Sequence, residues 1–177
     1  MSDPAVSAQP GSSAEVVRTE ETSFESFFQD HTQRLYAHLC LITGNRAEAE
    51  ELAQEAFLKV WERWDRVAGM DEPVGYLYAI AMNLFRRRYR RAKLALRKTV
   101  SEEFGRDEFA TVEDRSIVAR ALAELAPRQR AALVLTELIG FSSEEAGAML
   151  GVRPGTVRSL ASQGRVALKR CVEADDV

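Results

Sequence analysis

The stretch Ser142–Arg170 reads SSEEAGAMLGVRPGTVRSLASQGRVALKR and predicts two short helices joined by a tight turn. Ser142 and Glu145 have capping-box spacing, in which the hydroxyl and the carboxylate satisfy free amides of the first helical turn. Gly151 stands where a left-handed C-cap would close that helix, and Pro154 stands where its fixed φ suits the first turn of the next. The pattern indicates a helix-turn-helix.

The charge of this stretch suggests its partner. From Ala146 to Val172 there are five basic residues and no Asp or Glu. A helix that faces another protein would rarely exclude acids so completely, whereas a phosphate backbone repels them. We therefore expect the second helix to lie in a DNA groove. The alternative is an ordinary helical hairpin with a solvated basic face, because capping boxes and basic helices are common.

The composition fits a globular protein whose charges are unevenly distributed. The chain has 177 residues, 46% of them hydrophobic, and a net charge of -3. This length allows one medium domain or two small helical domains. From Pro73 to Ser101 there are eight Arg or Lys and no acid, whereas Glu102 to Asp114 holds six acids against Arg106 alone. The acidic segments offset the charge of two basic surfaces, so the net charge of the whole chain does not reveal them.

Several classes of protein are not expected. No apolar run is long enough to span a bilayer, and the first 22 residues lack the features of a signal peptide, so a cytoplasmic protein without membrane insertion is predicted. Cys40 and Cys171 have no metal-type spacing, and no ligand set surrounds His31 and His38. We expect no metal, no cofactor and, without a carboxylate cluster of catalytic type, no enzyme.

Periodicity predicts an all-α chain with two helical modules. Residues 1–21 are rich in Ser, Ala, Gly and Pro, which predicts a flexible tail. The first module is expected at 22–98, an acidic linker at 99–113, the second module at 114–172 and a short tail at 173–177. Besides the helix-turn-helix, helices are predicted from the capping pattern at 22–25 to about Gly44, at about 46–67, from Pro73 onward, and at about 114–125 and 128–139.

The helix expected at 46–67 has two distinct faces. The buried stripe is predicted to hold Leu52, Ala53, Ala56, Phe57, Val60, Trp61 and Trp64. The opposite face shows Glu51, Gln54, Glu55, Leu58 and Glu62.

The helix that begins at Pro73 leads into Phe85–Arg91, which reads FRRRYRR. Aromatic rings interleaved with guanidinium groups suit a single nucleic-acid strand, because rings stack on bases while Arg pairs with phosphates. The alternative is a helix end whose cations favour the macrodipole. The number of cations exceeds what the macrodipole needs, which favours nucleic-acid contact.

Together these segments resemble a bacterial RNA polymerase sigma factor of the extracytoplasmic-function group of the sigma-70 family, which keeps only conserved regions 2 and 4. The run 47–61, AEAEELAQEAFLKVW, resembles the helix that docks on the clamp coiled coil of the largest polymerase subunit. The run 76–83, YLYAIAMN, resembles the segment that meets the −10 element. In region 4, LAPRQR at 125–130 and GTVRS at 155–159 resemble the module that reads the −35 element.

The resemblance implies a protein that binds core RNA polymerase, reads the −35 and −10 promoter elements and helps to melt DNA. Implied partners are the clamp coiled coil, the flap region of the second-largest subunit, promoter DNA and an anti-sigma protein. Contacts to core polymerase are expected at Glu51, Gln54, Glu55 and Leu58. Contacts to −10 DNA are expected at Val67, Gly69, Met70, Asp71, Tyr76, Asn83, Arg86, Arg87 and Arg88. Contacts to −35 DNA are expected at Arg153, Thr156, Arg158, Ser159, Ser162, Gln163 and Arg165.

The chain departs from the family pattern at several places. The loop 67–73, which in the family holds the flipped −10 base, has no aromatic residue here, although many relatives have one. Arg153 stands where relatives place a Ser N-cap, which loses about 1 kcal/mol of capping and adds a phosphate contact. Leu160, Ser162, Gln163 and Gly164 occupy positions that are Arg-rich in relatives. We therefore expect altered −35 contacts.

The main rival function is a transcriptional regulator that binds operator DNA alone through the same helix-turn-helix. Such a protein is typically a symmetric dimer with paired half-sites. The clamp-type helix and the Arg-aromatic segment would then have no purpose, which favours the sigma factor. A nuclease is a second rival, but no carboxylate cluster with His or metal spacing supports one.

Overall fold

The computed structural model describes residues 23–98 and 121–175, and every regular element in these ranges is helical. In chain order the helices are α1 (Phe24–Thr43), α2 (Arg46–Trp61), α3 (Trp64–Val67), α4 (Pro73–Lys98), α6 (Pro127–Leu133), the π-helical η2 (Val134–Ile139), α7 (Ser143–Leu150) and α8 (Pro154–Asp175). The all-α prediction is confirmed. The predicted tail at 1–21 and acidic linker at 99–113 lie outside the described residues. Within the two described ranges, no helix combines the length and apolarity that a membrane span requires.

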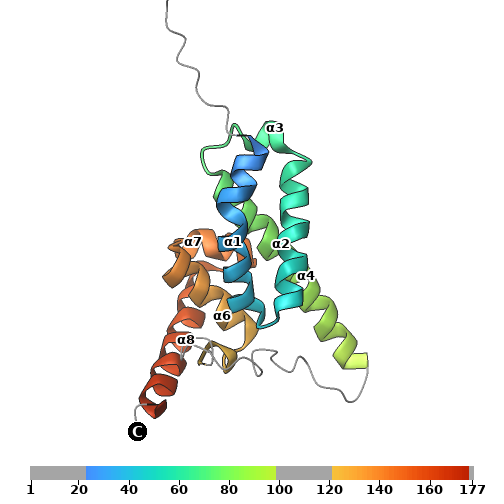
Figure 1. Cartoon of the computed structure of the whole chain (residues 1–177). Helices are drawn as coiled ribbons and strands as arrows, with labels where there is room; N and C mark the ends of the chain where they lie inside the picture. The colour runs from blue at the N-terminus through green and yellow to red at the C-terminus, as the bar shows by residue number, and fades with distance from the viewer. Residues whose placement is uncertain (1–22, 99–120, 176–177) are drawn as a thin grey trace, which may run out of the picture.

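The first module is built on α1, α2 and α4, which pack around one core (Figure 1). The hydroxyl of Ser23 caps α1 by accepting from the Ser26 amide at 3.2 Å, one residue later than the capping pattern predicted. Gly44 ends α1 with φ 74°, a conformation that a side chain would oppose. The Asn45 side chain then caps α2 by accepting from the Glu48 amide at 2.8 Å.

The prediction of a single helix over 46–67 is wrong in one respect, because the helix ends at Trp61. A turn at Glu62 and Arg63 separates α2 from the short α3. The break redirects the chain, so Trp64 packs against the Phe24 and Phe27 rings at 5.5 and 5.2 Å between centroids. Trp61 stays outside with 58% of its surface exposed, contrary to the predicted burial. The predicted buried stripe assumed one continuous helix over 46–67, and helical periodicity does not predict burial beyond a point where the helix axis changes direction.

The second module contains the predicted helix-turn-helix, formed by α7 and α8. Ser142 and Glu145 make both capping-box hydrogen bonds, at 3.2 and 2.7 Å. Gly151 has φ 64° and closes α7 as predicted. A Cβ on Gly147 would lie 2.9 Å from the Val152 carbonyl oxygen, so this glycine permits the close turn. The predicted helix 128–139 differs, because its second half is π-helical η2.

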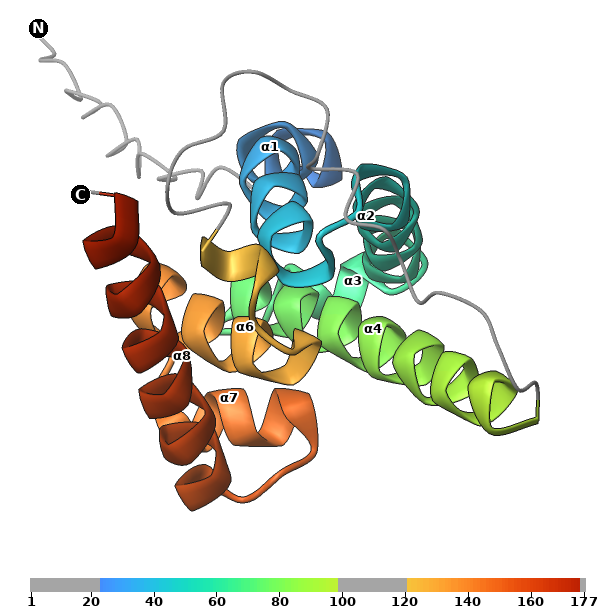
Figure 2. The ribbon, with the colours of Figure 1, turned by 90° about the horizontal axis from the view of Figure 1, so that it is seen from below.

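The two modules share one continuous core. Ala131, Leu135 and Met149 of the second module belong to the same buried cluster as Leu39 and Leu77 of the first. In Figure 2, α6 lies between α1 and α8, and α7 lies below α6, where it contacts α4 and α8. This closed arrangement brings residues of the two modules, far apart in sequence, into direct contact.

Candidate protein and nucleic-acid interfaces

The outer face of α2 carries the four predicted protein-contact residues together. Glu51, Gln54 and Leu58 are exposed, and Glu55 is half-buried. Their spacing places them on one helical stripe. The Gln54 amide donates to the Glu50 carboxylate at 3.2 Å, and Glu55 pairs with Lys59 at 3.9 Å. The face therefore combines carboxylates, an amide and an apolar side chain, as a protein interface requires.

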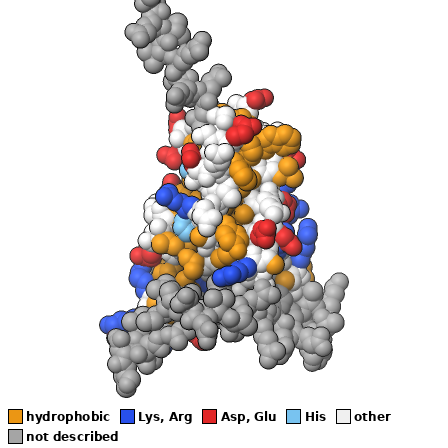
Figure 3. Space-filling model, viewed as in Figure 1, with side chains coloured by type: hydrophobic (Ala, Val, Ile, Leu, Met, Phe, Trp, Pro, Cys, Tyr) orange, Lys and Arg blue, Asp and Glu red, His pale blue; other side chains and the backbone are white. Residues whose placement is uncertain are grey.

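Beside this face lies an aromatic groove that the sequence analysis missed. The groove has a volume of about 530 Å³ and is lined by Phe24, Glu25, Phe28, Gln29, Gln54, Phe57, Leu58 and Trp61. Phe28 is 41% exposed and Leu58 51% exposed. Figure 3 shows the corresponding apolar patch over the ends of α1 and α2. The spacing of Gln54, Leu58 and Trp61 could have revealed it, since 54, 58 and 61 lie on one helical stripe.

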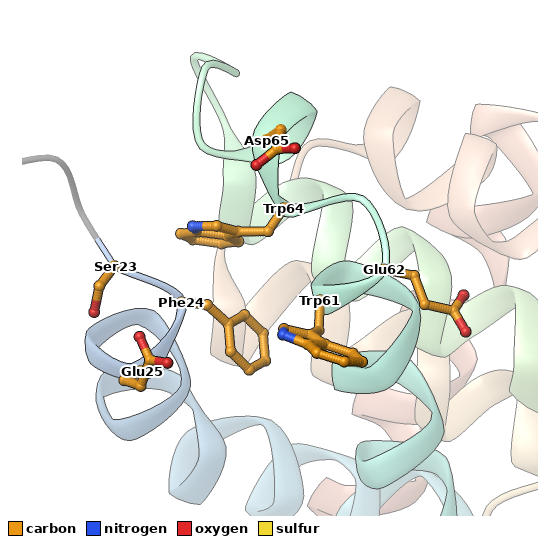
Figure 4. Close-up of a pocket in the computed structure, with 7 residues that line it drawn as sticks. All are labelled: Ser23, Phe24, Glu25, Trp61, Glu62, Trp64 and Asp65. Carbon is orange, nitrogen blue, oxygen red and sulfur yellow. The ribbon is translucent and has the colours of Figure 1, made fainter.

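The groove continues into a second hollow at the start of α1. Figure 4 shows the rings of Phe24, Trp61 and Trp64 facing one another there. Glu25, Glu62 and Asp65 also line this hollow, so acidic residues accompany the aromatic ones. This composition fits an apolar segment with basic flanks.

The predicted −10 residues of α4 lie in different environments. Asn83 and Arg87 are exposed. Arg86 is half-buried and donates to the Asn83 side chain at 3.1 Å and to the Met149 carbonyl of α7 at 3.3 Å. Arg88 faces α2, where it pairs with Glu51 at 2.6 Å. Only part of the predicted cationic row is therefore open to solvent in the closed arrangement.

The loop after α3 presents fewer side chains than predicted. Val67 is completely buried and Met70 packs against the core. Gly69 and Asp71 are exposed. Half-buried Tyr76 accepts a 3.4 Å hydrogen bond from Arg63 through its hydroxyl. The exposed surface at this loop thus includes the backbone of Gly69 and the carboxylates of Asp71 and Glu72.

The predicted −35 residues are all exposed, six of them on the predicted recognition helix α8 and Arg153 directly before it. Exposed residues are Arg153, Thr156, Arg158, Ser159, Ser162, Gln163 and Arg165. The inner face is formed by Val157, Ala161 and Gly164. A Cβ on Gly164 would lie 3.4 Å from the Leu133 side chain. Position 164 is therefore a packing position, which explains why no Arg stands there.

Two exposed arginines of α8 make surface ion pairs within the second module. Arg158 lies 3.6 Å from Glu144, and Arg165 lies 2.6 Å from Glu137. Such exposed pairs contribute only about 0–1 kcal/mol, so phosphates can compete for these side chains. The helix remains available for DNA in the closed arrangement.

Among the titratable side chains of the first module, His38 and Cys40 are half-buried and Tyr78 is buried. The His38 ring nitrogen lies 2.5 Å from the Tyr78 hydroxyl. Burial lowers the pKa of His38 and raises the pKa of Tyr78 to about 12. Burial likewise raises the pKa of the Cys40 thiol. Across the described ranges, 23–98 and 121–175, no group of His, Cys, Asp or Glu is arranged to hold a metal ion.

Comparison with known proteins identifies the two modules. The sequence model described as Sigma-70 region 2 matches residues 27–94, and the one described as Sigma-70, region 4 matches residues 115–168. RNA polymerase sigma factor CarQ of Myxococcus xanthus is 30% identical over 154 residues, which cover 84% of this chain and 88% of CarQ. ECF RNA polymerase sigma factor SigE of Mycolicibacterium smegmatis is 33% identical over 157 residues, which cover 83% of this chain. The chain belongs to the extracytoplasmic-function sigma factors.

Solved structures show the same fold as this sigma factor. The sigma factor RpoE of Bartonella quintana, in complex with the anti-sigma factor NepR, aligns with a TM-score of 0.65 at 23% identity, covering 87% of this chain and 99% of RpoE. Sigma factor SigJ of Mycobacterium tuberculosis aligns with a TM-score of 0.56 at 28% identity, covering 81% of this chain and 52% of SigJ. The match to SigE spans 60% of that relative's length. Most residues of the aromatic groove lie within the region 2 match, and most of α8 lies within the region 4 match.

Proposed function

We propose that this sigma factor docks on core RNA polymerase through α2, holds the −10 strand on α4 and the adjoining loop, and reads the −35 element with α8. The observation that carries the proposal is the separation of these surfaces. The α2 face is acidic and apolar, whereas α8 is cationic, and both are exposed in one molecule. A protein partner and DNA can thus be bound by different elements of the same chain.

Docking on the clamp coiled coil uses Glu51, Gln54, Glu55 and Leu58 together with the aromatic groove. Trp is among the residues that most often dominate the binding energy of an interface, and Trp61 is exposed in this groove. The carboxylates beside the rings favour a cationic partner and exclude acidic ones.

The −10 element is engaged as a single strand. Asn83 offers an amide to a base edge, and Arg86 and Arg87 offer guanidinium groups to phosphates. Gly69 and Asp71 supply the backbone and carboxylate of the adjoining loop. Flipping a base out of the duplex costs a few kcal/mol, so trapping that base converts binding into melting without nucleotide hydrolysis.

Reading both elements at once requires the two modules to separate. The elements lie about 25 base pairs apart by their positions, which is about 85 Å at about 3.4 Å per pair. With 26 residues, α4 is the longest of the described helices, and at about 1.5 Å per residue it spans only about 39 Å. The closed arrangement therefore represents the protein before it reaches a promoter, and the contacts between the modules break on the polymerase. Region 4 then rests on the flap.

An anti-sigma protein is the further partner of this proposal. The related RpoE structure contains the anti-sigma factor NepR. A similar protein that covered the aromatic groove here would block polymerase docking without touching α8. This regulation would take place in the cytoplasm, where core polymerase and the chromosome are found.

The deciding experiment combines core polymerase with the purified protein. The proposal predicts co-elution with core enzyme and promoter-specific transcripts, whose 5′ ends define both elements. Tight binding to operator DNA by the free protein, together with no binding to core enzyme, would establish the stand-alone regulator instead. Equal transcription from unrelated DNA would remove the assignment of the −35 and −10 surfaces.

A further inference from the structure

Arg88 of α4 connects two surfaces that have separate roles in the proposed function, the polymerase-binding face of α2 and the DNA-binding segment of α4. Its guanidinium lies 2.6 Å from the Glu51 carboxylate and 3.6 Å from the Glu55 carboxylate, using one terminal nitrogen for each. Both acids are on the α2 face proposed to meet polymerase. Arg88 belongs by sequence to the cationic row proposed to meet DNA.

The acids of α2 form a row of like charges that needs a cation. Glu48, Glu51 and Glu55 are spaced by three and four residues, so their side chains are neighbours on one helix and repel one another. Burial raises the pKa of Glu48, and the charge of Glu51 adds to that rise. Arg88 opposes the rise, with a smaller opposing effect from Arg130 of α6. Arg88 is thus the cation of α4 that lies within this row.

The exposures show which side of each carboxylate is occupied. The Arg88 side chain is 31% exposed, whereas Glu51 and Glu55 are 65% and 40% exposed. The guanidinium therefore approaches the carboxylates from the α4 side, and both acids keep surface open to solvent. A planar guanidinium can hold two carboxylates at a fixed separation, which a point-like ammonium cannot do.

We propose that Arg88 is a positioning residue for polymerase docking. It holds the Glu51 and Glu55 side chains together on α2 in the arrangement that binds the clamp coiled coil. This inference rests on the proposed function of the α2 face. It assigns Arg88 to the protein interface, whereas Arg86 and Arg87 of the same segment remain with the −10 strand.

The physical gain is preorganisation. Each long side chain that an interface immobilises loses rotamer freedom, and that loss opposes binding. Arg88 restrains two such side chains before polymerase arrives and cancels the repulsion between them. Without it, the carboxylates would spread apart, and the clamp would have to order them during docking.

The experiment measures the affinity of full-length protein for core polymerase in the absence of DNA. Arg88→Ala is expected to weaken binding about three- to tenfold, an effect in the range of one well-placed ion-pair network. Arg88→Lys should recover only part of the lost affinity, because lysine restores the positive charge but not the planar guanidinium that can bind two carboxylates at once. Arg46→Ala, which removes an exposed cation at the start of the same α2 helix, is the matched control and should bind as wild type. Thermal melting shows whether each variant is folded.

A second background tests whether Arg88 acts through the two acids. In a Glu51→Gln/Glu55→Gln protein, Arg88→Ala should cause no further loss of polymerase affinity. An equal loss in both backgrounds would overturn the inference, as would unchanged or tighter binding by Arg88→Ala. The inference would also be overturned if Arg88→Ala bound core polymerase normally but its holoenzyme bound a −10 single strand more weakly. That result would make Arg88 a DNA contact. If wild-type protein fails to bind core enzyme, the proposed function itself fails.

Discussion

The Arg130 guanidinium of α6 donates to the Thr43 carbonyl at the end of α1, 3.2 Å away. Arg130 is only 7% exposed and lies over Gly44, where a Cβ would be 2.7 Å from one of its nitrogens. A cation at a helix C-terminus is favourable because the last carbonyls carry partial negative charge. This contact joins region 4 to region 2 in the closed arrangement, which the proposed function expects promoter binding to open.

Gly44→Ala is expected to loosen this arrangement. The added Cβ meets the Arg130 side chain and opposes φ 74°, so we expect a loss of about 1–2 kcal/mol in the free energy of unfolding and an increase in the radius of gyration by X-ray scattering. Gly75→Ala is the control, because its nearest neighbour atom lies 3.7 Å away and its backbone is helical. If both variants remain equally compact, Gly44 does not maintain the interface.

Trp61→Ala should weaken polymerase binding while leaving the stability of the fold nearly unchanged. Because Trp61 is 58% exposed, its loss should leave the melting temperature nearly unchanged. As an aromatic anchor it should cost about 2 kcal/mol or more in polymerase affinity, a loss of about thirtyfold. Leu94→Ala removes an equally exposed apolar side chain from α4, outside the groove, and should bind normally. Equal affinities for wild type and Trp61→Ala would exclude the groove from the docking surface.

Arg158→Ala tests how α8 reads DNA. If this side chain contacts a base, its removal should cost about 1–3 kcal/mol and relax selectivity at one −35 position. Transcription from promoters with each substitution at the −35 element measures this. A uniform loss across all of these promoters would make Arg158 a phosphate contact.

Gly164→Arg should not add a DNA-contacting cation to α8. The side chain would be forced against Leu133 and Leu125, so we expect about 1–3 kcal/mol of destabilisation by urea unfolding. Ser162→Arg adds the same cation at an exposed position and should leave stability unchanged. Normal stability of Gly164→Arg would contradict the close packing of α8 on α6.

His38 should make stability depend on pH. Burial lowers its pKa in the folded protein below the unfolded value of 6.5. The unfolded chain therefore binds more protons as the pH falls through 6.5, and stability decreases there, whereas it is unaffected by this group at higher pH. The pKa of His31 is lowered in the same direction, mainly by burial. Urea unfolding at pH 8 and pH 5.5 should show a smaller difference in His38→Gln than in wild type.

Local chemistry made much of the fold predictable. The capping box of Ser142, the left-handed Gly151 and Pro154 specify the helix-turn-helix through interactions within a few residues, and the structure has each of them. The exposed face of α2 and the exposed residues of α8 also follow from helical period alone. The break after Trp61 did not, because the packing of Trp64 on Phe24 and Phe27 decides the direction of the chain there.

The sequence by itself determined most of the helices, the charge on each of them and the resemblance to the sigma-factor family. Only the tertiary structure decided which side chains meet across helices. It placed Arg88 on the acids of α2, Arg130 on the end of α1 and Trp61 in an open groove. The reason is physical: capping and periodicity act over one or two turns, whereas these contacts join residues more than thirty positions apart or depend on the junction of two helix axes.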